Sequence, residues 1–465
     1  MRVFFITILF VCIILFFAST APCVDEIIII TEPTIEETPQ EFKQKKLKSL
    51  KDNLSIRGFI QTKGAVDTNN DAANEHDYTF YNNARIEGKW TFEGSRNYIF
   101  ASIDSEYLWF GPHNNEEDYD LDLFEGYFYW SNKRIVRPRF RTTPIQYGIK
   151  RYFSWLRGPV DIRVGRQIVR WGKTDQISPV DNLNPQDLRE FITHDLEDRK
   201  IPNWMVRARL FSDFFTVEGI YLPFFESSRI DYFGTDWAIF RHMNRIGVHE
   251  EEPDRKFKNG EGGVRVTKTI SGWDLGLSYL YAWEDLPYFE TFPTGGGDVQ
   301  ITYKRSNIFG FEFETTAGEI GLRGEAAYFD QQSFLTNNLT STRKIVYYYI
   351  VGVDYSGEND WYINIQFSHQ IITNYDSTIL YFKRNNPSLC GEISKEFQEG
   401  YFEAELKYNF ALNENSFYLS PRIICSYASN LDITLGLNIF EGDSDTLMGL
   451  YDANDQIYID FKYYF

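Results

Sequence analysis

The chain has 465 residues and a formal net charge of −19, an acidic balance that argues against a nucleic-acid partner. Hydrophobic residues make up 43% of it, yet the one long apolar run stands at the N-terminus, which excludes a membrane protein made of several apolar helices of about 20 residues. Aromatic residues reach 17%, with 31 Tyr and 40 Phe, an excess typical of transmembrane β-barrels, which place aromatic side chains in two girdles at the membrane interfaces.

The N-terminus predicts an exported protein. Arg2 precedes an apolar stretch from Val3 to Phe17, and small residues follow it up to Ala21. This order is typical of a secretory signal peptide, which we expect over residues 1–21. Residues 22–53 are an acidic leader followed by a short basic segment, and we expect the barrel domain to occupy residues 54–465.

From residue 54 onward, segments of about ten residues alternate apolar and polar side chains. In residues 400–410, for example, Phe402, Ala404 and Leu406 alternate with Glu403 and Glu405. A period of two indicates a β-strand, and about ten residues suffice to cross a bilayer at a tilt. No helical period of comparable strength interrupts the pattern.

The connections between these strands alternate in length, as they do in outer-membrane barrels. Short turns are predicted at residues 93–97, 212–213, 270–272, 317–318, 356–360 and 429. Long polar loops are predicted at residues 67–77, 111–119, 172–201, 223–259, 284–304, 331–343 and 441–454, and two long periplasmic connections at 132–158 and 385–397. The expected fold class is therefore an all-β, antiparallel transmembrane barrel of the outer-membrane type, with 18 strands as the best count and 14–18 compatible with the pattern.

The last segment, residues 455–465, is a strand whose apolar face carries Ile457, Ile459, Phe461, Tyr463 and Phe465. An aromatic face of this kind resembles the assembly signal of bacterial outer-membrane barrels, which implies that Phe461, Tyr463 and Phe465 serve that signal. The expected location is the outer membrane of a Gram-negative bacterium. The expected partners are its lipid and the barrel assembly machinery.

One motif, R-x-G-R-Q-x-x-x-W-G, is more specific. With it the chain resembles an uncharacterised family of outer-membrane β-barrels, known as a domain of unknown function, and more distantly the alginate-export-like porins. The resemblance implies fold and location but no particular solute. The residues that carry it are Arg163, Gly165, Arg166, Gln167, Trp171, Gly172, Asn184, Pro185 and Asp187.

Between Lys133 and Leu210 the chain has 17 Lys and Arg against 8 Asp and Glu, although the whole chain is acidic. Arg207 and Arg209 alternate with apolar residues, and facing the lumen spares each the roughly 2–4 kcal/mol that a charge facing lipid at mid-depth would cost. We expect a basic lumen wall made of Arg137, Arg139, Arg141, Arg163, Arg166, Arg170, Arg207 and Arg209.

Gly165 and Arg166 break the alternation, which predicts a β-bulge. Asn184 and Pro185, with an acid at Asp187, predict the start of a short helix. Residues 172–201 are expected to fold inward as a constriction whose carboxylates face the wall arginines. Its expected site residues are Asp181, Asn184, Pro185, Asp187 and Glu190.

Two interpretations of the basic wall remain open. It is either an electropositive passage for small anionic or carboxylated solutes or a network of ion pairs that holds the loop and plugs the barrel. The first predicts a porin-like channel or transporter. The second predicts a closed barrel that serves as an export or lipid-transfer component or as a surface adhesin.

Enzymatic and metal chemistry find little support in the sequence. The six histidines have no ligand spacing, and Cys390 and Cys425 fit neither a disulfide framework nor a zinc site. His194 and Asp195 are the only neighbouring pair that could serve catalysis. We expect no enzyme, no catalytic residues, no metal and no cofactor.

Overall fold

A computed structural model of the chain describes residues 53–68, 78–111, 116–132, 158–241, 243, 245–291, 298–357 and 359–465. The chain divides into two compact units, Met1–Lys51 and Asp52–Phe465, and all the strands described below belong to the second. The predicted signal peptide, nearly all of the leader, and Arg137, Arg139 and Arg141 of the predicted basic wall lie outside the described residues.

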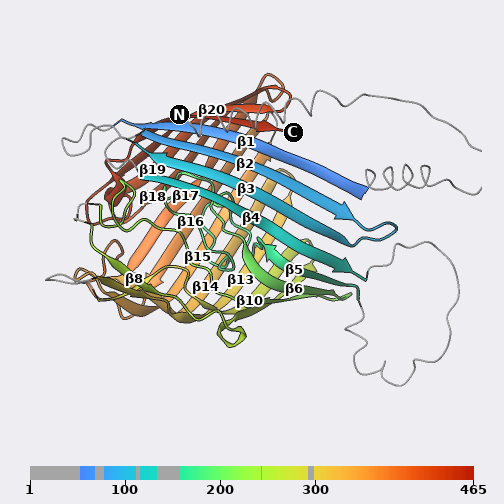
Figure 1. Ribbon diagram of the computed structural model, residues 1–465, viewed down its shortest axis with the longest axis horizontal. Helices are drawn as coiled ribbons and strands as arrows, with labels where there is room; N and C mark the ends of the chain where they lie inside the picture. Colours follow the sequence, from blue (N-terminus) through green and yellow to red (C-terminus); the bar gives the residue numbers. More distant parts are fainter. Residues whose placement is uncertain are drawn as a thin grey trace, which may run out of the picture. The chain divides into compact units, whose positions relative to one another are not determined.

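The described part of the chain folds into one sheet of 18 strands, as predicted (Figure 1). The first half contains β1 (Leu54–Asp67), β2 (Tyr78–Thr91), β3 (Tyr98–Phe110), β4 (Glu116–Ser131), β5 (Val160–Gln167), β6 (Asn203–Phe211), β7 (Thr216–Leu222), β9 (Glu261–Ile270) and β10 (Trp273–Trp283). The second half contains β13 (Arg305–Ala317), β14 (Ile320–Leu335), β15 (Ser341–Gly357), β16 (Trp361–Ile372), β17 (Asn385–Phe397), β18 (Phe402–Ala411), β19 (Ser416–Ala428), β20 (Leu431–Gly442) and β21 (Gln456–Tyr464).

The sheet closes into a barrel because β1 pairs antiparallel with both β2 and β21. At the seam, the main-chain N–H of Phe465 donates to the carbonyl of Gly58 at 3.0 Å, and the reverse bond measures 2.9 Å. This pairing joins the first and last strands, as a sheet that crosses hydrocarbon requires. The predicted fold class, an outer-membrane-type antiparallel barrel, is confirmed.

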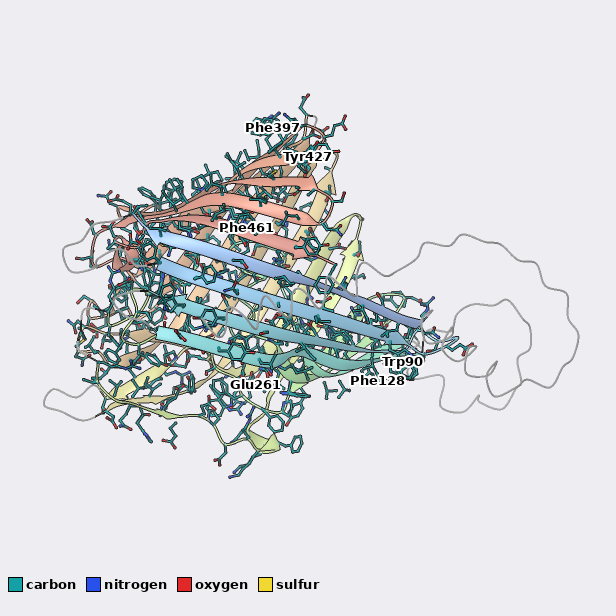
Figure 2. The ribbon with its side chains drawn as sticks, turned by 45° about the horizontal axis from the view of Figure 1, so that its top comes forward. Trp90, Phe128, Glu261, Phe397, Tyr427 and Phe461 are labelled. Carbon is teal, nitrogen blue, oxygen red and sulfur yellow. The ribbon has the colours of Figure 1, made fainter. Side chains whose placement is uncertain are left out.

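The period of two separates lipid-facing from lumen-facing side chains. On β21, Ile457, Ile459, Phe461 and Tyr463 are 39–48% exposed, whereas Gln456, on the opposite face of the strand, is 5% exposed. Some of the exposed aromatic residues lie near strand ends, where interfacial girdles are expected. Figure 2 labels four exposed aromatic residues near strand ends. They are Trp90, Phe128, Phe397 and Tyr427.

Two predicted connections were wrong. Residues 385–397 form β17, which pairs with β16 and β18 over nearly its whole length. Pro387, Cys390 and Gly391 obscure its alternation, and main-chain pairing on both sides overrides that weak local signal. Residues 331–343 are largely strand as well, because β14 continues to Leu335 and β15 begins at Ser341.

The predicted bulge at Gly165 was also wrong, because the pairing of β4 with β5 and of β5 with β6 runs without a register shift. Gly165 has φ of +140°, and a Cβ there would lie 2.1 Å from the carbonyl oxygen of Gly126. Glycine is required at this position because β4 approaches closely.

The long loops carry a second, small sheet of β8 (Val248–Glu251), β11 (Tyr288–Thr291) and β12 (Val299–Thr302), and two 3₁₀ turns, η2 (Phe257–Asn259) and η3 (Gly449–Tyr451). Phe233, Phe240, Phe289, Val299 and Ile301 form a core around this sheet. No helix among the described residues has the length and apolar character that crossing a membrane requires.

Candidate functional site

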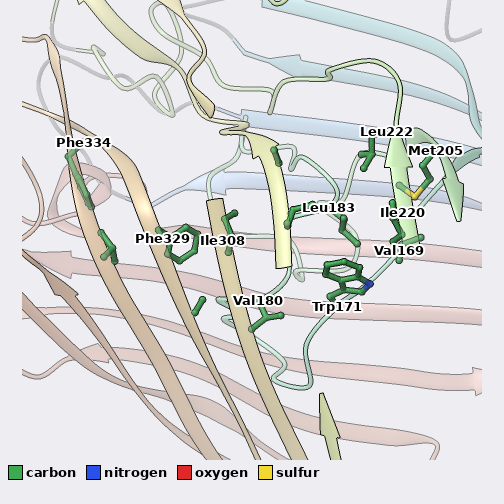
Figure 3. Close-up of a cluster of buried hydrophobic side chains, with 14 of the residues drawn as sticks. Val169, Trp171, Val180, Leu183, Met205, Ile220, Leu222, Ile308, Phe329 and Phe334 are labelled. Atoms are coloured by element: carbon green, nitrogen blue, oxygen red, sulfur yellow. The ribbon is translucent and has the colours of Figure 1, made fainter. Parts of the chain in front are cut away.

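The loop of residues 172–201, named the inward loop below, leaves the wall after β5 and crosses the lumen. Around its start, Trp171 is fully buried, and its indole N–H donates to Glu218 of β7 at 2.6 Å. Figure 3 shows Trp171, Val180 and Leu183 among apolar side chains of the wall. One side of the lumen is therefore filled by a packed apolar core. Its wall members include Met205, Ile220, Leu222, Leu280, Ile308 and Phe329.

Glu325 of β14 anchors the loop to the far wall. Its carboxylate accepts hydrogen bonds from the main-chain N–H groups of Lys173 at 2.5 Å, Thr174 at 2.7 Å and Val180 at 3.1 Å. It also accepts hydrogen bonds from the hydroxyls of Thr174 at 2.7 Å and Ser178 at 2.8 Å. Glu325 is 2% exposed. Because a buried carboxylate needs this many donors, the loop and the carboxylate fix each other.

Asp195 forms the second anchor. Its carboxylate accepts from Lys407 of β18 at 2.5 Å and from Arg422 of β19 at 3.2 Å. Burial alone would raise the pKa of Asp195, but Arg422 and Lys407 outweigh burial and hold this pKa below its usual range. Asp195 thus stays ionised and bound to the wall. The adjacent His194 binds Glu190 instead. The two residues considered from the sequence as a catalytic pair therefore have different partners.

The third anchor joins Glu190 to β1. Its carboxylate lies 2.6 Å from His194 Nε2 and 3.9 Å from the ammonium of Lys63. Burial would raise the pKa of Glu190, but Lys63, His194 and Arg189 together lower it to about 2. The inward loop therefore contacts β1, β14, β18 and β19, which span the half of the barrel from β14 through β21 to β1.

The predicted constriction residues lie in this loop, but they bind partners other than the predicted wall arginines. Asp181 pairs with Lys200 of the same loop, and both side chains are at most 3% exposed. Asp187 pairs with Arg189 at 2.5 Å and lies 3.9 Å from Arg229.

The predicted helix after Asn184 does not form. Asn184 is buried, and its side chain accepts from Val169 N–H at 2.8 Å and donates to the carbonyls of Gln167 and Ile201. The same amide that would cap a helix thus joins the two ends of the loop where it leaves and re-enters the wall. The carbonyl of Pro185 accepts from Ile201 N–H at 2.8 Å, which continues this junction.

Each of the five described arginines of the predicted basic wall has a partner. Arg207 binds Glu218 at 2.5 Å, and Arg209 lies 3.6 Å from Asp161 and 4.0 Å from Glu218. Arg163 lies over the rings of Tyr127 and Tyr129 at 5.1 and 5.8 Å. The other two bind carboxylates directly, Arg166 at Asp122 and Arg170 at Glu197.

A cavity of about 600 Å³ remains between the inward loop and the wall of β15–β19. Hydroxyl and amide side chains cover the wall, and apolar side chains cover the loop side. Its charged lining comprises six carboxylates against three Lys and Arg, one of them Arg170 of the basic wall, so negative groups outnumber positive ones. The wall residues include Ser368, Gln370, Ser388, Asn409 and Ser420, and the apolar ones Phe191, Ile192, Leu196, Phe382 and Met448.

Sequence reasoning missed the wall residues that hold the loop and the preceding Trp171. Glu312 accepts from the main-chain N–H of Gly172, and the others are Glu218, Glu325, Lys407 and Arg422. Each stands at a polar position of an alternating strand, so the alternation indicated its lumen-facing direction. Nothing in the local sequence indicated its partner. Among the described residues, no cluster of three or more His, Cys, Asp or Glu is arranged to hold a metal ion, and Cys390 and Cys425 are unpaired.

The sequence profile of the family described as "Protein of unknown function (DUF1302)" matches residues 48–403. No curated protein matches the chain. Among solved structures, "Salmonella typhi OmpF complex with Daunomycin" is similar at 11% identity and a TM-score of 0.41, over 89% of this chain and 98% of that one. A triple mutant of the Rh. blastica porin is similar at 10% identity and a TM-score of 0.37, over 89% of this chain and all of that one.

Proposed function

The chain belongs to the family described as "Protein of unknown function (DUF1302)", and for this member we propose a function from the geometry of the barrel. The protein is a porin-like channel of the bacterial outer membrane. Solutes pass beside the inward loop, through the cavity along β15–β19. The channel is selective, because the loop and its packed core narrow the lumen beside this cavity of about 600 Å³. Transport without chemistry fits the lumen, whose His194 and Asp195 are engaged in anchoring the loop.

The lining of the cavity carries the proposal about the solute. A volume of about 600 Å³ falls in the range of sites for small organic molecules. Ser, Asn and Gln side chains on one side offer hydrogen bonds, and aromatic and aliphatic side chains on the other offer apolar contact. We propose neutral or weakly basic organic solutes with one polar and one apolar side.

The anion preference suggested by the arginine pattern finds no support in this lining. Asp122, Asp161, Glu197 and Glu218 engage arginines of the basic wall, so that wall holds the loop and the strands together. The acidic cavity would repel a carboxylated solute, since charges lining a narrow passage act at close range.

The ion selectivity of the reconstituted channel tests this proposal. In a KCl gradient across a planar bilayer, we expect a reversal potential that indicates cation preference, because carboxylates outnumber cations in the cavity. Glu392→Gln, which removes a carboxylate of the lining, should shift the potential toward zero. Arg209→Gln is the matched control on the opposite wall and should leave the potential unchanged.

An anion preference that falls in Arg209→Gln would restore the basic wall as the passage. The absence of any conductance would instead favour the closed barrel, with an export, lipid-transfer or adhesive role. Both outcomes contradict the proposed route.

A further inference from the structure

The barrel wall has an incomplete ladder between β4 and β5. β4 pairs with β3 from Tyr129 to Glu116, but with β5 only from Ser131 to Gly126. β5 ends at Gln167, where the chain turns into the lumen, and Gln167 pairs with Asn203, the first residue of β6. Among the described residues, the half of β4 from residue 117 to 125 has a strand partner on one side only.

This half-strand faces outward with apolar side chains. Tyr119 and Leu121 are 63% and 62% exposed, and Leu123 is 36% exposed, as on the lipid-facing side of the other strands. A strand edge without a main-chain partner is unfavourable in hydrocarbon, where each unsatisfied group costs free energy. Closed barrels otherwise avoid such edges.

Ion pairs lie along the lumen side of this half-strand. The inward-facing side chains Asp118, Asp120 and Asp122 each bind one arginine from a different segment. Arg189 of the inward loop reaches Asp118 at 2.5 Å, Arg229 of the β7–β9 loop reaches Asp120 at 2.8 Å, and Arg166 of β5 reaches Asp122. The side chains of the three aspartates are 58%, 37% and 38% exposed, so the pairs close a seam that is not packed shut. We call this stretch the β4 seam.

A thin partition separates the β4 seam from the main cavity. A small space of about 60 Å³ behind the seam is lined by Asp120, Asp122 and Arg229, and the main cavity lies on the other side of the inward loop. Asp198 and Arg199 line both spaces. Arg199 is 8% exposed, and its Nε has no hydrogen-bond partner among the described residues. A buried N–H group without such a partner costs free energy, because water would solvate it better.

We propose that the β4 seam is a lateral opening, through which a solute with an apolar body moves between the main cavity and the outer leaflet of the membrane. This inference rests on the proposed function, because it takes the main cavity as the site that the solute reaches. The apolar side of that cavity, with Phe191, Ile192 and Phe382, accommodates the body of the solute. Side-chain ion pairs can part and re-form without unzipping a ladder of main-chain hydrogen bonds.

Cross-linking after folding tests the opening. In a cysteine-free background, Asp120→Cys and Arg229→Cys are joined by a short bis-maleimide across the β4 seam. Arg57→Cys and Glu87→Cys, joined in the same way, are the matched control, because that ion pair spans a complete ladder between β1 and β2. Proteins are reconstituted in vesicles that contain a neutral long-chain alcohol bearing a diazirine. After illumination, labelling of the peptides that contain Phe191 and Phe382 is measured by mass spectrometry.

We expect the seam cross-link to reduce labelling from the membrane by about tenfold, because a probe dissolved in the bilayer can then no longer pass through the seam. The control cross-link should leave labelling unchanged. The double variant Asp120→Asn with Arg229→Gln lacks the ion pair between these two side chains. Its Phe191 and Phe382 peptides should be labelled severalfold faster than those of the parent. Equal labelling in the seam and control cross-linked proteins, or no gain in the double variant, would overturn the lateral opening.

Supplying the probe from water separates this failure from failure of the proposed function. If the cavity is the solute site, the cross-linked protein is still labelled at Phe191 and Phe382 by probe supplied in water. If these peptides stay unlabelled from either side in every variant, the cavity is no solute site, and both proposals are wrong.

Discussion

Glu325→Ala is expected to release the inward loop from the far wall and to raise the single-channel conductance severalfold. Five donors of the loop converge on this one carboxylate, from Lys173, Thr174, Ser178 and Val180. Hydrogen bonds to a charged group contribute about 1.5–3 kcal/mol each, so losing even two of them shifts the loop strongly toward a detached state. Single-channel recording in planar bilayers measures the change, and limited proteolysis of residues 172–201 reports the detachment.

Glu314→Gln is the matched control. Glu314 also binds the loop, through the ammonium of Lys173 at 2.7 Å, but the two side chains are 33% and 27% exposed. An ion pair this accessible to water contributes at most about 1 kcal/mol. The conductance of the Glu314→Gln variant should therefore match that of the parent. Equal conductance in Glu325→Ala and Glu314→Gln would show that Glu325 does not hold the loop in the lumen.

Lys200→Met is expected to destabilise the folded barrel by about 3–5 kcal/mol, because it leaves the carboxylate of Asp181 buried without its cation. The two side chains are 3% and 2% exposed, and Asp181 also accepts from the main-chain N–H of Trp171 at 3.2 Å. Burial raises the pKa of Asp181, while Lys200 opposes that rise. The midpoint of urea unfolding in detergent micelles, followed by gel mobility without heating, measures the loss.

The double variant Lys200→Met with Asp181→Asn separates the charge from the packing. Removing both charges should recover most of the stability, because no buried ion remains unpaired. A double variant as unstable as Lys200→Met would place the loss in the packing of the lysine chain.

The sequence alone predicted the barrel because one physical rule repeats along it. Every crossing strand meets lipid on one side and the lumen on the other, so alternation such as that of Ile457, Ile459 and Phe461 indicates both a strand and its orientation. The rule failed at β17, where Pro387 and Gly391 interrupt the alternation, and pairing with β16 and β18 decides the structure.

The inward direction of residues 172–201 was also predicted, but its contacts were not. Thr174 and Glu325 stand 151 residues apart, and Asp195 and Arg422 stand 227 apart. Pairings at such separations depend on strand order and register around a closed barrel, which local sequence does not specify. Asn184 illustrates the same limit, because its helix-capping pattern is used to join two strand ends.

The conductance of a channel without the inward loop tests the central claim most directly. Thr174 and Glu197 both bind the guanidinium of Arg170, so residues 175–196 can be replaced by a Gly-Ser linker of about four residues, which spans up to about 14 Å. If this loop narrows the lumen, the shortened protein should assemble as a heat-modifiable barrel and conduct severalfold more than the parent. An assembled barrel whose conductance equals that of the parent would contradict a lumen occupied by residues 172–201.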